Sequence, residues 1–328
     1  MNYTKKIISV ATLASISVLT ACGDSASSTK ADSELATPQD STTLQQPGNN
    51  SDTASIPSGN EGTTLDTLSG NQGESTATID STESSIPMPQ ILSFEEEMAR
   101  DSLFVEASAD TGFSSIESVY QNLAPGERVI FLIRHAKRIT NTSKEATLVH
   151  AGIVQSQTVG AKLASKEAFA YGHTDFVRTQ QTAENIAIGR GETFPGSVVI
   201  PELTEDWYIK DHEKLAAYDT LNDPSLIYSQ WAYNDMYADA FNDLKTSCVR
   251  AITELLLPKM SETARVNIIV SHDMFIGPLT VYCTNKKVNR LRYWETDMWV
   301  YFVSGLAIIV KPNGERRYIA IDGVDYDS

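Results

Sequence analysis

The sequence predicts an α/β protein, a three-layer α/β/α sandwich built on a mostly parallel sheet. Two short apolar runs rich in β-branched residues, 129–134 and 266–271, are typical of buried parallel strands. Stretches with apolar residues at helical spacing separate the expected strands, and this alternation indicates a sheet covered by helices on both faces. Sheets of this kind bind ligands at the carboxyl ends of their strands, so the residues at the ends of these runs are the first candidates for a site.

The N-terminal part differs in composition from the rest of the 328-residue chain. Two lysines precede an apolar run, 7–19, that is too short to cross a membrane, so residues 1–21 are expected to be a signal peptide. Residues 22–90 are rich in Ser, Thr, Gly, Asn and Pro and show no helical or strand periodicity, which predicts a disordered tether. One globular domain is therefore expected over residues 91–328.

The charge of the chain is strongly acidic, with a formal net charge of -16. Residues 24–90 alone contain ten acidic residues and one lysine, Lys30. Nothing in the sequence resembles a basic nucleic-acid-binding surface, so nucleic acid is not expected as a partner. An acidic protein that acts on an anionic substrate needs a local cluster of cations, because its overall field repels the substrate.

The expected helices of the domain follow from N-cap residues and from apolar residues three and four positions apart. They begin at 93 and span 114–120, 149–164, 179–188, 238–257 and 274–282, with short helices in the aromatic-rich stretch 206–233. Besides the two buried runs, strands are expected at 175–177, 198–200, 300–310 and 317–321, the last two joined by a turn at 312–314.

The domain contains two cysteines, Cys248 and Cys283. In an oxidising compartment they can form a disulfide. Two separate buried thiols on helices fit the sequence at least as well, because unpaired cysteine is among the most often buried residues. Neither cysteine has metal-ligand spacing around it, so no metal site is expected.

Arginine and histidine side chains lie at the ends of the expected strands. Arg134, His135 and Arg138 end the first buried run, and His272 follows the second. Two guanidiniums beside an imidazole are costly to bury unless an anion joins them, which predicts a phosphate or carboxylate site. Arg178 lies at another strand-to-helix junction. If the three junctions share one sheet edge, the set suits phosphoryl transfer, in which arginines offset transition-state charge and no metal is required.

Five segments in this order resemble motifs of the histidine phosphatase superfamily, and the resemblance covers about residues 128–328. The family's Arg-His-Gly motif is similar to Arg134-His135-Ala136, with alanine in the place of glycine. The other similar segments are Leu148-Val149-His150-Ala151-Gly152, 174–183, Leu203-Thr204-Glu205 and Ile269-Val270-Ser271-His272. The resemblance implies a phosphoglycerate-mutase-like fold and an enzyme that needs no cofactor.

The resemblance also implies a role for each matching residue. His135 would be the nucleophile that becomes phosphohistidine. Arg134 and Arg178 would bind the phosphoryl group, and His272 would form a hydrogen bond to one of its oxygens. Arg138 matches a further phosphate-binding arginine of the acid phosphatase and phytase branch of the family.

The two branches of the family differ in the acid that protonates the leaving group. In the acid phosphatase and phytase branch the donor is the aspartate of a His-Asp pair, which Asp273 matches. In the mutase branch the donor is a glutamate, which Glu205 resembles. The match of Arg138 and of the His-Asp pair favours Asp273, and Glu205 remains the alternative.

The end of the expected signal peptide, Leu19-Thr20-Ala21-Cys22, resembles the lipobox of bacterial lipoproteins. The resemblance implies that Cys22 carries a lipid such as palmitate, which would anchor the chain in the cell envelope with no other contact to the membrane. The sequence therefore predicts a metal-independent phosphomonoesterase that acts on a phosphorylated small molecule or a phosphorylated envelope component. A non-catalytic phosphate-binding surface lipoprotein is the main alternative, and a phosphomutase is a less favoured one.

Overall fold

The computed structural model describes residues 87–100 and 112–324. The chain divides into two units, Met1–Ala77 and Thr78–Ser328, and all described residues belong to the second. The expected signal peptide, the lipidation site Cys22 and all but the last residues of the expected tether lie outside the described residues, so these expectations stay predictions.

A seven-stranded sheet forms the centre of the described part, with the strand order β1-β7-β6-β2-β5-β3-β4. The strands are β1 Ser114–Ser115, β2 Arg128–Arg134, β3 Phe169–His173, β4 Val198–Val199, β5 Val266–Ser271, β6 Gly305–Val310 and β7 Arg316–Asp322. Strand β5 lies between β2 and β3 and runs parallel to both, whereas β6 is antiparallel to its two neighbours. The expected fold class is confirmed, and β6 with β7 forms the expected closing hairpin.

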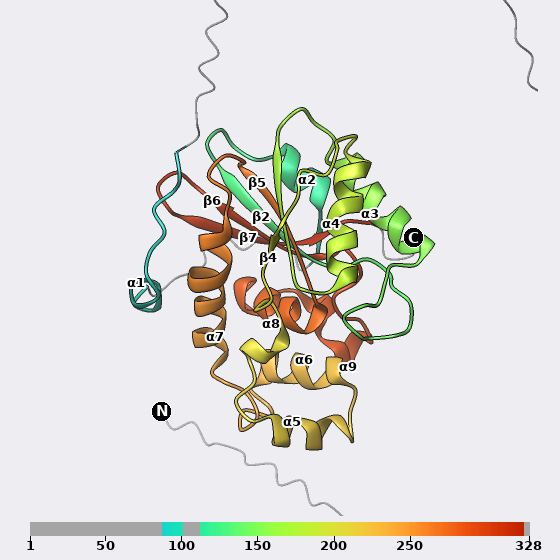
Figure 1. Cartoon of the computed structure of the whole chain (residues 1–328). Helices are drawn as coiled ribbons and strands as arrows, with labels where there is room; N and C mark the ends of the chain where they lie inside the picture. The colour runs from blue at the N-terminus through green and yellow to red at the C-terminus, as the bar shows by residue number, and fades with distance from the viewer. Residues whose placement is uncertain (1–86, 101–111, 325–328) are drawn as a thin grey trace, which may run out of the picture. The chain divides into compact units, whose positions relative to one another are not determined.

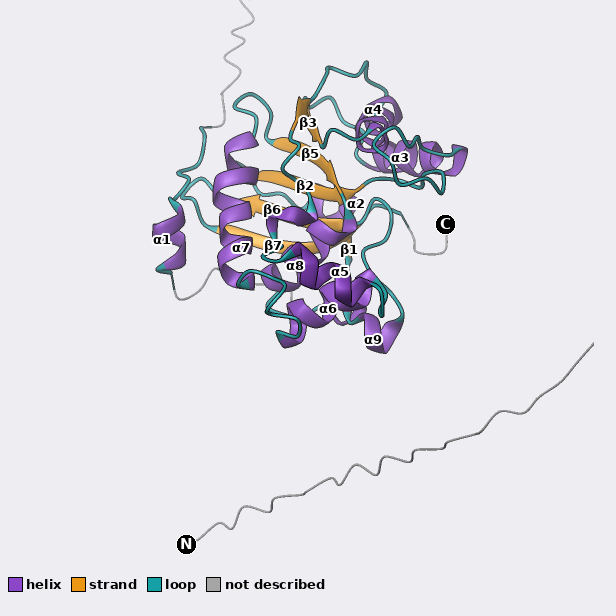
Figure 2. Cartoon of the chain, turned by 60° about the horizontal axis from the view of Figure 1, so that its bottom comes forward, coloured by secondary structure: helices purple, strands orange, loops and turns teal. Residues whose placement is uncertain are grey.

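Helices cover both faces of this sheet (Figures 1 and 2). The α-helices are α1 Phe94–Met98, α2 Ile116–Gln121, α3 His150–Lys162, α4 Val177–Gly189, α5 His212–Asp219, α6 Pro224–Asn234, α7 Leu244–Arg250, α8 Asp273–Cys283 and α9 Tyr293–Thr296. Helices α2, α3 and α4 pack on one face, and α7 and α8 pack on the other. Helix α6 packs against α8 on the side away from the sheet, and α5 lies against α6.

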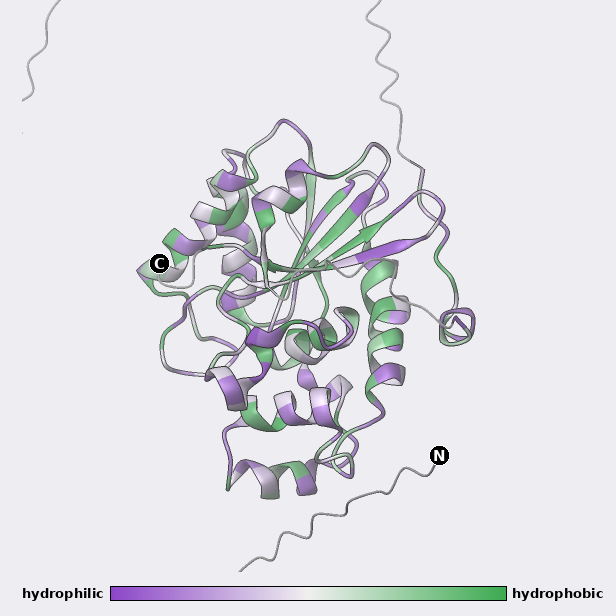
Figure 3. Ribbon diagram, turned by 180° about the vertical axis from the view of Figure 1, so that it is seen from behind, coloured by the Kyte–Doolittle hydropathy of each residue, from purple (hydrophilic) through white to green (hydrophobic). Residues whose placement is uncertain are grey.

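The alternation of side chains along β2 divides the core into two layers. Ile130 and Leu132 point toward the α7 and α8 layer, whereas Val129, Phe131 and Ile133 point toward the α3 and α4 layer. All five side chains are fully buried. Figure 3 shows the same pattern as hydrophobic colour along the central strands. A strand buried on both faces fits the continuous apolar run in the sequence.

Three element boundaries differ from the sequence-based expectation. The strand expected at 175–177 is wrong, because the strand is β3, Phe169–His173, and Phe176 is already the N-cap of α4. The helix expected from 238 begins only at Leu244, where the Asp243 side chain caps it, and it continues as a π-helix, Ala251–Leu256. The strand expected from 300 begins only at Gly305.

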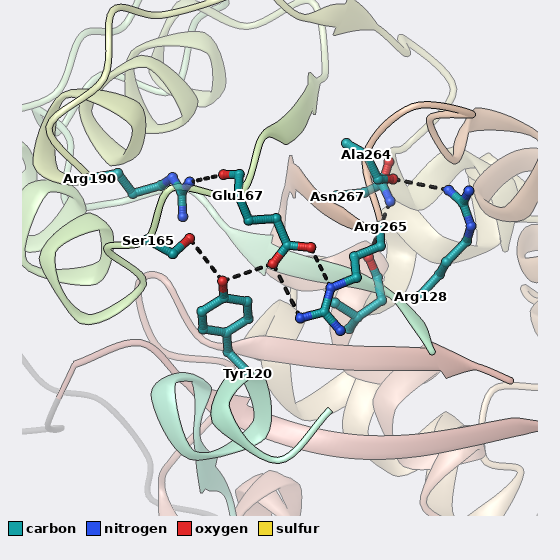
Figure 4. A network of polar contacts seen from close by, with 9 residues as sticks. Tyr120, Arg128, Ser165, Glu167, Arg190, Ala264, Arg265 and Asn267 are labelled. Carbon is teal, nitrogen blue, oxygen red and sulfur yellow. Dashed lines mark hydrogen bonds and ion pairs between the residues drawn. The ribbon is translucent and has the colours of Figure 1, made fainter. Parts of the chain in front are cut away.

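A polar network fixes the amino ends of the central strands (Figure 4). The Glu167 carboxylate, just before β3, forms an ion pair with Arg265, just before β5. The same carboxylate accepts a hydrogen bond of 2.9 Å from the Tyr120 hydroxyl of α2. The Arg128 guanidinium, at the start of β2, donates to the backbone oxygens of Ser261 and Ala264. These contacts lie at the edge of the sheet opposite to the carboxyl ends of β2, β3 and β5.

Cys248 and Cys283 are two free, buried thiols, as one of the two sequence-based alternatives expected. Burial raises the pKa of both thiols well above its ordinary value, so they stay protonated and unreactive. None of the helices in the described ranges has the length and apolar character that a membrane crossing requires.

Candidate active site

The carboxyl ends of three neighbouring parallel strands bring the predicted site residues together. Arg134 pairs with Ser271 in the register between β2 and β5, and His173 pairs with Val270 in the register between β3 and β5. The residues that follow each strand therefore leave the sheet at one edge. His135 directly follows β2, and His272 directly follows β5. Arg178 lies in the first turn of α4, which follows β3.

The turn after β2 is held by side chains from α4. The backbone N–H of Ala136 donates to the Thr182 hydroxyl over 3.0 Å, and that hydroxyl donates to the Arg178 carbonyl over 2.7 Å. Ala136 is fully buried and its φ is not positive, so alanine in the family's glycine position brings no backbone strain. Thr182 therefore ties the turn after His135 to the first turns of α4.

These junctions surround a cavity of about 650 Å³. Both histidines, His135 and His272, line it. Its cationic lining residues are Arg134, Arg138, Lys144 and Arg178, and its acidic lining residues are Asp175, Glu205, Asp206 and Asp273. All seven residues expected to act in catalysis or phosphate binding therefore face one cavity.

His135 presents a free nitrogen to this cavity. Its Nδ1 lies 2.8 Å from the Ala136 carbonyl oxygen, which can only accept, so Nδ1 carries the proton and Nε2 keeps its lone pair. The side chain is 3% exposed. Burial, with the neighbouring charge of Arg134, holds the pKa of His135 well below its usual range. The imidazole is therefore neutral, as a nucleophile must be.

His272 is neutral for the same reasons, since burial and the charge of Arg178 lower its pKa to about 3. Its Nε2 lies 3.1 Å from the Thr174 hydroxyl, and its Nδ1 lies 3.5 Å from Arg178 Nη2. A guanidinium can only donate, so Nδ1 accepts and Nε2 carries the proton. The hydroxyl of Thr179, which donates to the Phe176 carbonyl, lies 2.9 Å from the Thr174 hydroxyl and completes a chain of donors behind His272.

In each of three arginines that line the cavity, Nη1 donates to a backbone carbonyl, whereas Nε has no hydrogen-bond partner. Arg134 Nη1 donates to the Val300 carbonyl, Arg178 Nη1 donates to the Ser143 carbonyl over 2.9 Å, and Arg138 Nη1 donates to the Asn141 carbonyl over 2.8 Å. The Nε atom of each of these three arginines is buried without a hydrogen-bond partner. Three guanidiniums that line one cavity indicate a place for an anion, because charge-assisted hydrogen bonds to an anion offset their desolvation.

Burial and the charge of Arg138 lower the pKa of Arg178 to about 10. This shift shows that the two guanidiniums repel each other across the cavity. An anion between them removes this repulsion, which favours a doubly charged phosphoryl group over an uncharged ligand. Arg138 thus lines the same cavity as Arg178, and its role in phosphate binding stays a prediction.

The two candidate acids have different surroundings. Asp273 Oδ2 forms an ion pair of 2.9 Å with Arg134 Nη2. Glu205, in a short 3-10 helix Glu205–Trp207, forms no ion pair with any described residue. Burial, together with the charges of Asp206 and Asp273, raises the pKa of Glu205. A raised pKa favours the protonated form of the carboxyl, which is the form that donates a proton.

Two aromatic side chains of the site were not anticipated from the sequence. The Phe302 ring lies 4.6 Å from the Arg134 guanidinium carbon, and the Phe176 ring lies 4.2 Å from that of Arg178. Both rings hold a guanidinium by its flat face and leave its edge for a ligand. Phe176 was mistaken for a strand residue, and Phe302 follows no pattern that distinguishes it from a core residue.

No group of histidine, cysteine, aspartate and glutamate side chains among residues 87–100 and 112–324 has the arrangement of a metal site.

Comparison with known proteins supports the family suggested by the motifs. The family model of the histidine phosphatase superfamily (branch 1) matches residues 130–301. No curated protein matches the sequence. Among solved structures, a mycobacterial glucosyl-3-phosphoglycerate phosphatase matches with 15% identity and a TM-score of 0.39, covering 59% of this chain and 97% of its own.

Two further solved structures show similar values. Phosphoglycerate mutase from Bacillus anthracis str. Sterne matches with 15% identity and a TM-score of 0.40, covering 60% of this chain and 93% of its own. The alpha-ribazole phosphatase from Shigella flexneri matches with 18% identity and a TM-score of 0.38, covering 60% of this chain and 97% of its own. On the family match over residues 130–301, this chain belongs to the histidine phosphatase superfamily.

Proposed function

We propose that this protein is a metal-independent phosphomonoesterase that acts through a phosphohistidine on His135. The observation that carries the proposal is the neutral His135, whose Nε2 keeps its lone pair, in a cavity lined by Arg134, Arg138 and Arg178. A binding protein for phosphate needs the arginines, but it does not need a histidine held in the nucleophilic tautomer.

In the first step, His135 Nε2 attacks phosphorus, and the bond from phosphorus to the ester oxygen breaks. Arg134, Arg138 and Arg178 bind the non-bridging oxygens and offset the charge that spreads over them in the transition state. His272 lies beside Arg178 and shares the phosphoryl site. Its Nδ1 faces Arg178 in the ligand-free arrangement, so its tautomer must change before it can donate to a phosphoryl oxygen.

We assign the proton donor to Glu205 and keep Asp273 as the alternative. The leaving alkoxide needs a proton as the ester bond breaks, and a donor must be protonated at the working pH. Burial and two neighbouring carboxylates favour the protonated form of Glu205. Asp273 is better suited to hold Arg134 in place, because it forms an ion pair with it. This assignment reverses the preference that the His-Asp motif suggested.

In the second step, a water molecule attacks the phosphohistidine, and the Glu205 carboxylate formed in the first step takes a proton from that water. The nitrogen–phosphorus bond breaks, inorganic phosphate leaves, and His135 returns to its neutral form. Glu205 thus alternates between acid and base, and no proton is gained or lost by the protein over the cycle.

The proposal includes the location of the enzyme, which rests on the sequence alone. A lipid on Cys22 would anchor the chain in the cell envelope, and residues 22–90 would separate the catalytic domain from the membrane. The substrate would then be a phosphorylated small molecule or a phosphorylated component of the envelope. Nucleic acid does not fit, because the chain is acidic and its cations are gathered inside the cavity.

Phosphate release from 4-nitrophenyl phosphate and from an alkyl phosphate tests the proposal with the full-length protein. We expect turnover that is unchanged by a chelator and that falls by at least about 1,000-fold in His135→Ala. His150→Ala is the matched control, because His150 is exposed on α3 and does not line the cavity. Full activity of His135→Ala, or loss of activity with the chelator, would contradict the proposal.

A further inference from the structure

Only some of the charged side chains that line the cavity form ion pairs with one another. Lys144 forms an ion pair with Asp175, and Arg134 forms one with Asp273. Arg138 and Arg178 form no ion pair with a described residue, and together with Arg134 they are the groups proposed to bind the phosphoryl group. The two remaining acids, Glu205 and Asp206, line the same cavity and form no ion pair with a described residue. The cavity therefore has no further cation for a second anionic group on the substrate.

The unpaired acids lie where the alcohol part of the substrate must lie. The donor has to reach the ester oxygen, so the Glu205 side chain marks the position of the leaving group. Asp206 is the next residue in the same 3-10 helix and is exposed to solvent. Its negative charge acts on Glu205, whose pKa it helps to raise. The leaving group thus enters the part of the cavity that Glu205 and Asp206 line.

We propose that the substrate is a phosphomonoester of an amino alcohol, with an ammonium group that pairs with Asp206, and that esters with a second anionic group are rejected. The inference rests on the proposed phosphatase function and adds a substrate class to it. Pro201, Pro224 and Met274, which line the cavity near Glu205, provide apolar surface for the carbon chain of such an alcohol. We infer an ammonium group because the Asp206 carboxylate forms no ion pair with a described residue.

The preference for an ester with an ammonium group is stronger in the transition state than in the ground state. Proton donation converts Glu205 to a carboxylate beside Asp206, so two negative charges then adjoin the leaving alcohol. An ammonium group on the alcohol offsets their repulsion, whereas a carboxylate on the alcohol adds to it. Because the interaction strengthens as the ester bond breaks, it is expected in kcat/KM as a selectivity between substrates.

Two matched pairs of substrates test this inference with the full-length protein. O-phosphoethanolamine is compared with ethylene glycol monophosphate, which replaces the ammonium by a hydroxyl. Glycerol 3-phosphate is compared with 3-phosphoglycerate, which replaces a hydroxymethyl group by a carboxylate. We expect kcat/KM to be about fivefold higher for the ammonium ester and about fivefold lower for the carboxylate ester, the upper end of the effect of one charge beside a solvent-exposed carboxylate.

Asp206→Asn should bring both ratios to within about twofold of one, since it removes the charge that discriminates. Glu202→Gln is the matched control. Glu202 is an exposed acid four residues before Asp206, and it does not line the cavity. In this variant both kcat/KM ratios should stay as in the wild type. Equal kcat/KM within each pair, a preference for the carboxylate ester, or ratios that Asp206→Asn leaves unchanged would overturn the inference. If 4-nitrophenyl phosphate is not hydrolysed either, the proposed phosphatase function itself fails.

Discussion

Glu205 and Asp273 are two carboxylates in one cavity whose surroundings separate their roles. Asp273 Oδ2 lies 2.9 Å from Arg134 Nη2 and holds that guanidinium in place. Glu205 is partly buried beside other acids, and desolvation with their charges raises its pKa. Pairs of acids that are separated in this way are a common means of dividing proton donation from electrostatic support.

Glu205→Gln should lower kcat for an alkyl phosphate by about 100-fold or more, since general acid catalysis contributes about that much. For 4-nitrophenyl phosphate, whose leaving group needs no proton, we expect a loss of less than about tenfold. Asp273→Asn serves as the comparison, because it removes the partner of Arg134 and should lower both activities by similar factors. Steady-state kinetics on the two esters measures both ratios. The reverse pattern would assign the donor to Asp273.

The pH dependence follows from the same residues. A raised pKa on Glu205 means that the donor is lost as pH rises through that value, so the ratio of kcat/KM for alkyl over aryl phosphate should fall with increasing pH. On the acidic side, the lowered pKa values keep His135 and His272 neutral, the latter down to about pH 3. A loss of the aryl phosphatase activity near pH 6 that follows histidine protonation would contradict this account.

The nucleophile and the arginines could be predicted from sequence because each is tied to a strand end by a local pattern. His135 and His272 directly follow buried apolar runs, and Arg178 follows a strand that was misplaced by a few residues without moving the junction. The acid could not be chosen in this way. Its assignment depends on ion pairing and burial between segments far apart in the chain, which no local pattern records.

Close contact between backbones positions the elements that carry the site. A Cβ atom on Gly152, in the first turn of α3, would lie 2.0 Å from the Lys137 carbonyl oxygen in the turn after His135. A Cβ atom on Gly160 would lie 2.1 Å from the Ile186 carbonyl oxygen near the end of α4. Both glycines therefore permit a contact that any other residue would prevent. Gly152 allows α3 to pack against the turn after His135, whereas Gly160 allows only α3 and α4 to pack together.

Gly152→Ala and Gly160→Ala should each lower the free energy of unfolding by about 1–3 kcal/mol through the clash with a backbone carbonyl. Helix propensity alone predicts the opposite sign, a gain of about 1 kcal/mol. Gly152→Ala should in addition lower kcat/KM, because it displaces the turn after His135, whereas Gly160→Ala should retain it. Urea denaturation and steady-state kinetics measure these effects. A stabilised Gly152→Ala variant would show that the close approach is not required.

The predicted element boundaries are wrong where the local sequence pattern and the tertiary structure favour different elements. Strand β3 contains Ala170 and Gly172, which favour strands poorly, and it forms because β5 and β4 provide partners on both sides. The aromatic and β-branched residues at 176–177 fit a strand better in isolation, but they begin α4. The buried runs of β2 and β5 were assigned correctly because both of their faces are apolar.

At the scale of the whole molecule, a net charge of -16 surrounds a cavity that must bind an anion. The cations that line the cavity form a short-range site, and the acidic surface gives no long-range attraction. An anchored enzyme does not depend on such attraction if its substrate is also part of the envelope.

Cys22→Ser should move the protein from the detergent phase to the aqueous phase when a bacterial lysate is partitioned with a non-ionic detergent. The physical reason is the loss of the acyl chains, which are the only membrane contact that the account allows. Ser25→Ala, three residues further along the chain, is the matched control and should stay in the detergent phase. Metabolic labelling with palmitate gives a second readout. Retention of Cys22→Ser in the detergent phase would contradict the proposed anchor.

The covalent intermediate is the central claim of this account, and rapid acid-free quenching during turnover of 4-nitrophenyl phosphate tests it most directly. Mass spectrometry of the digested full-length protein should find one acid-labile phosphoryl group, on the peptide that contains His135, and none in His135→Ala. Steady turnover with no phosphoryl group on His135, or with the group on another residue, would contradict the proposed mechanism.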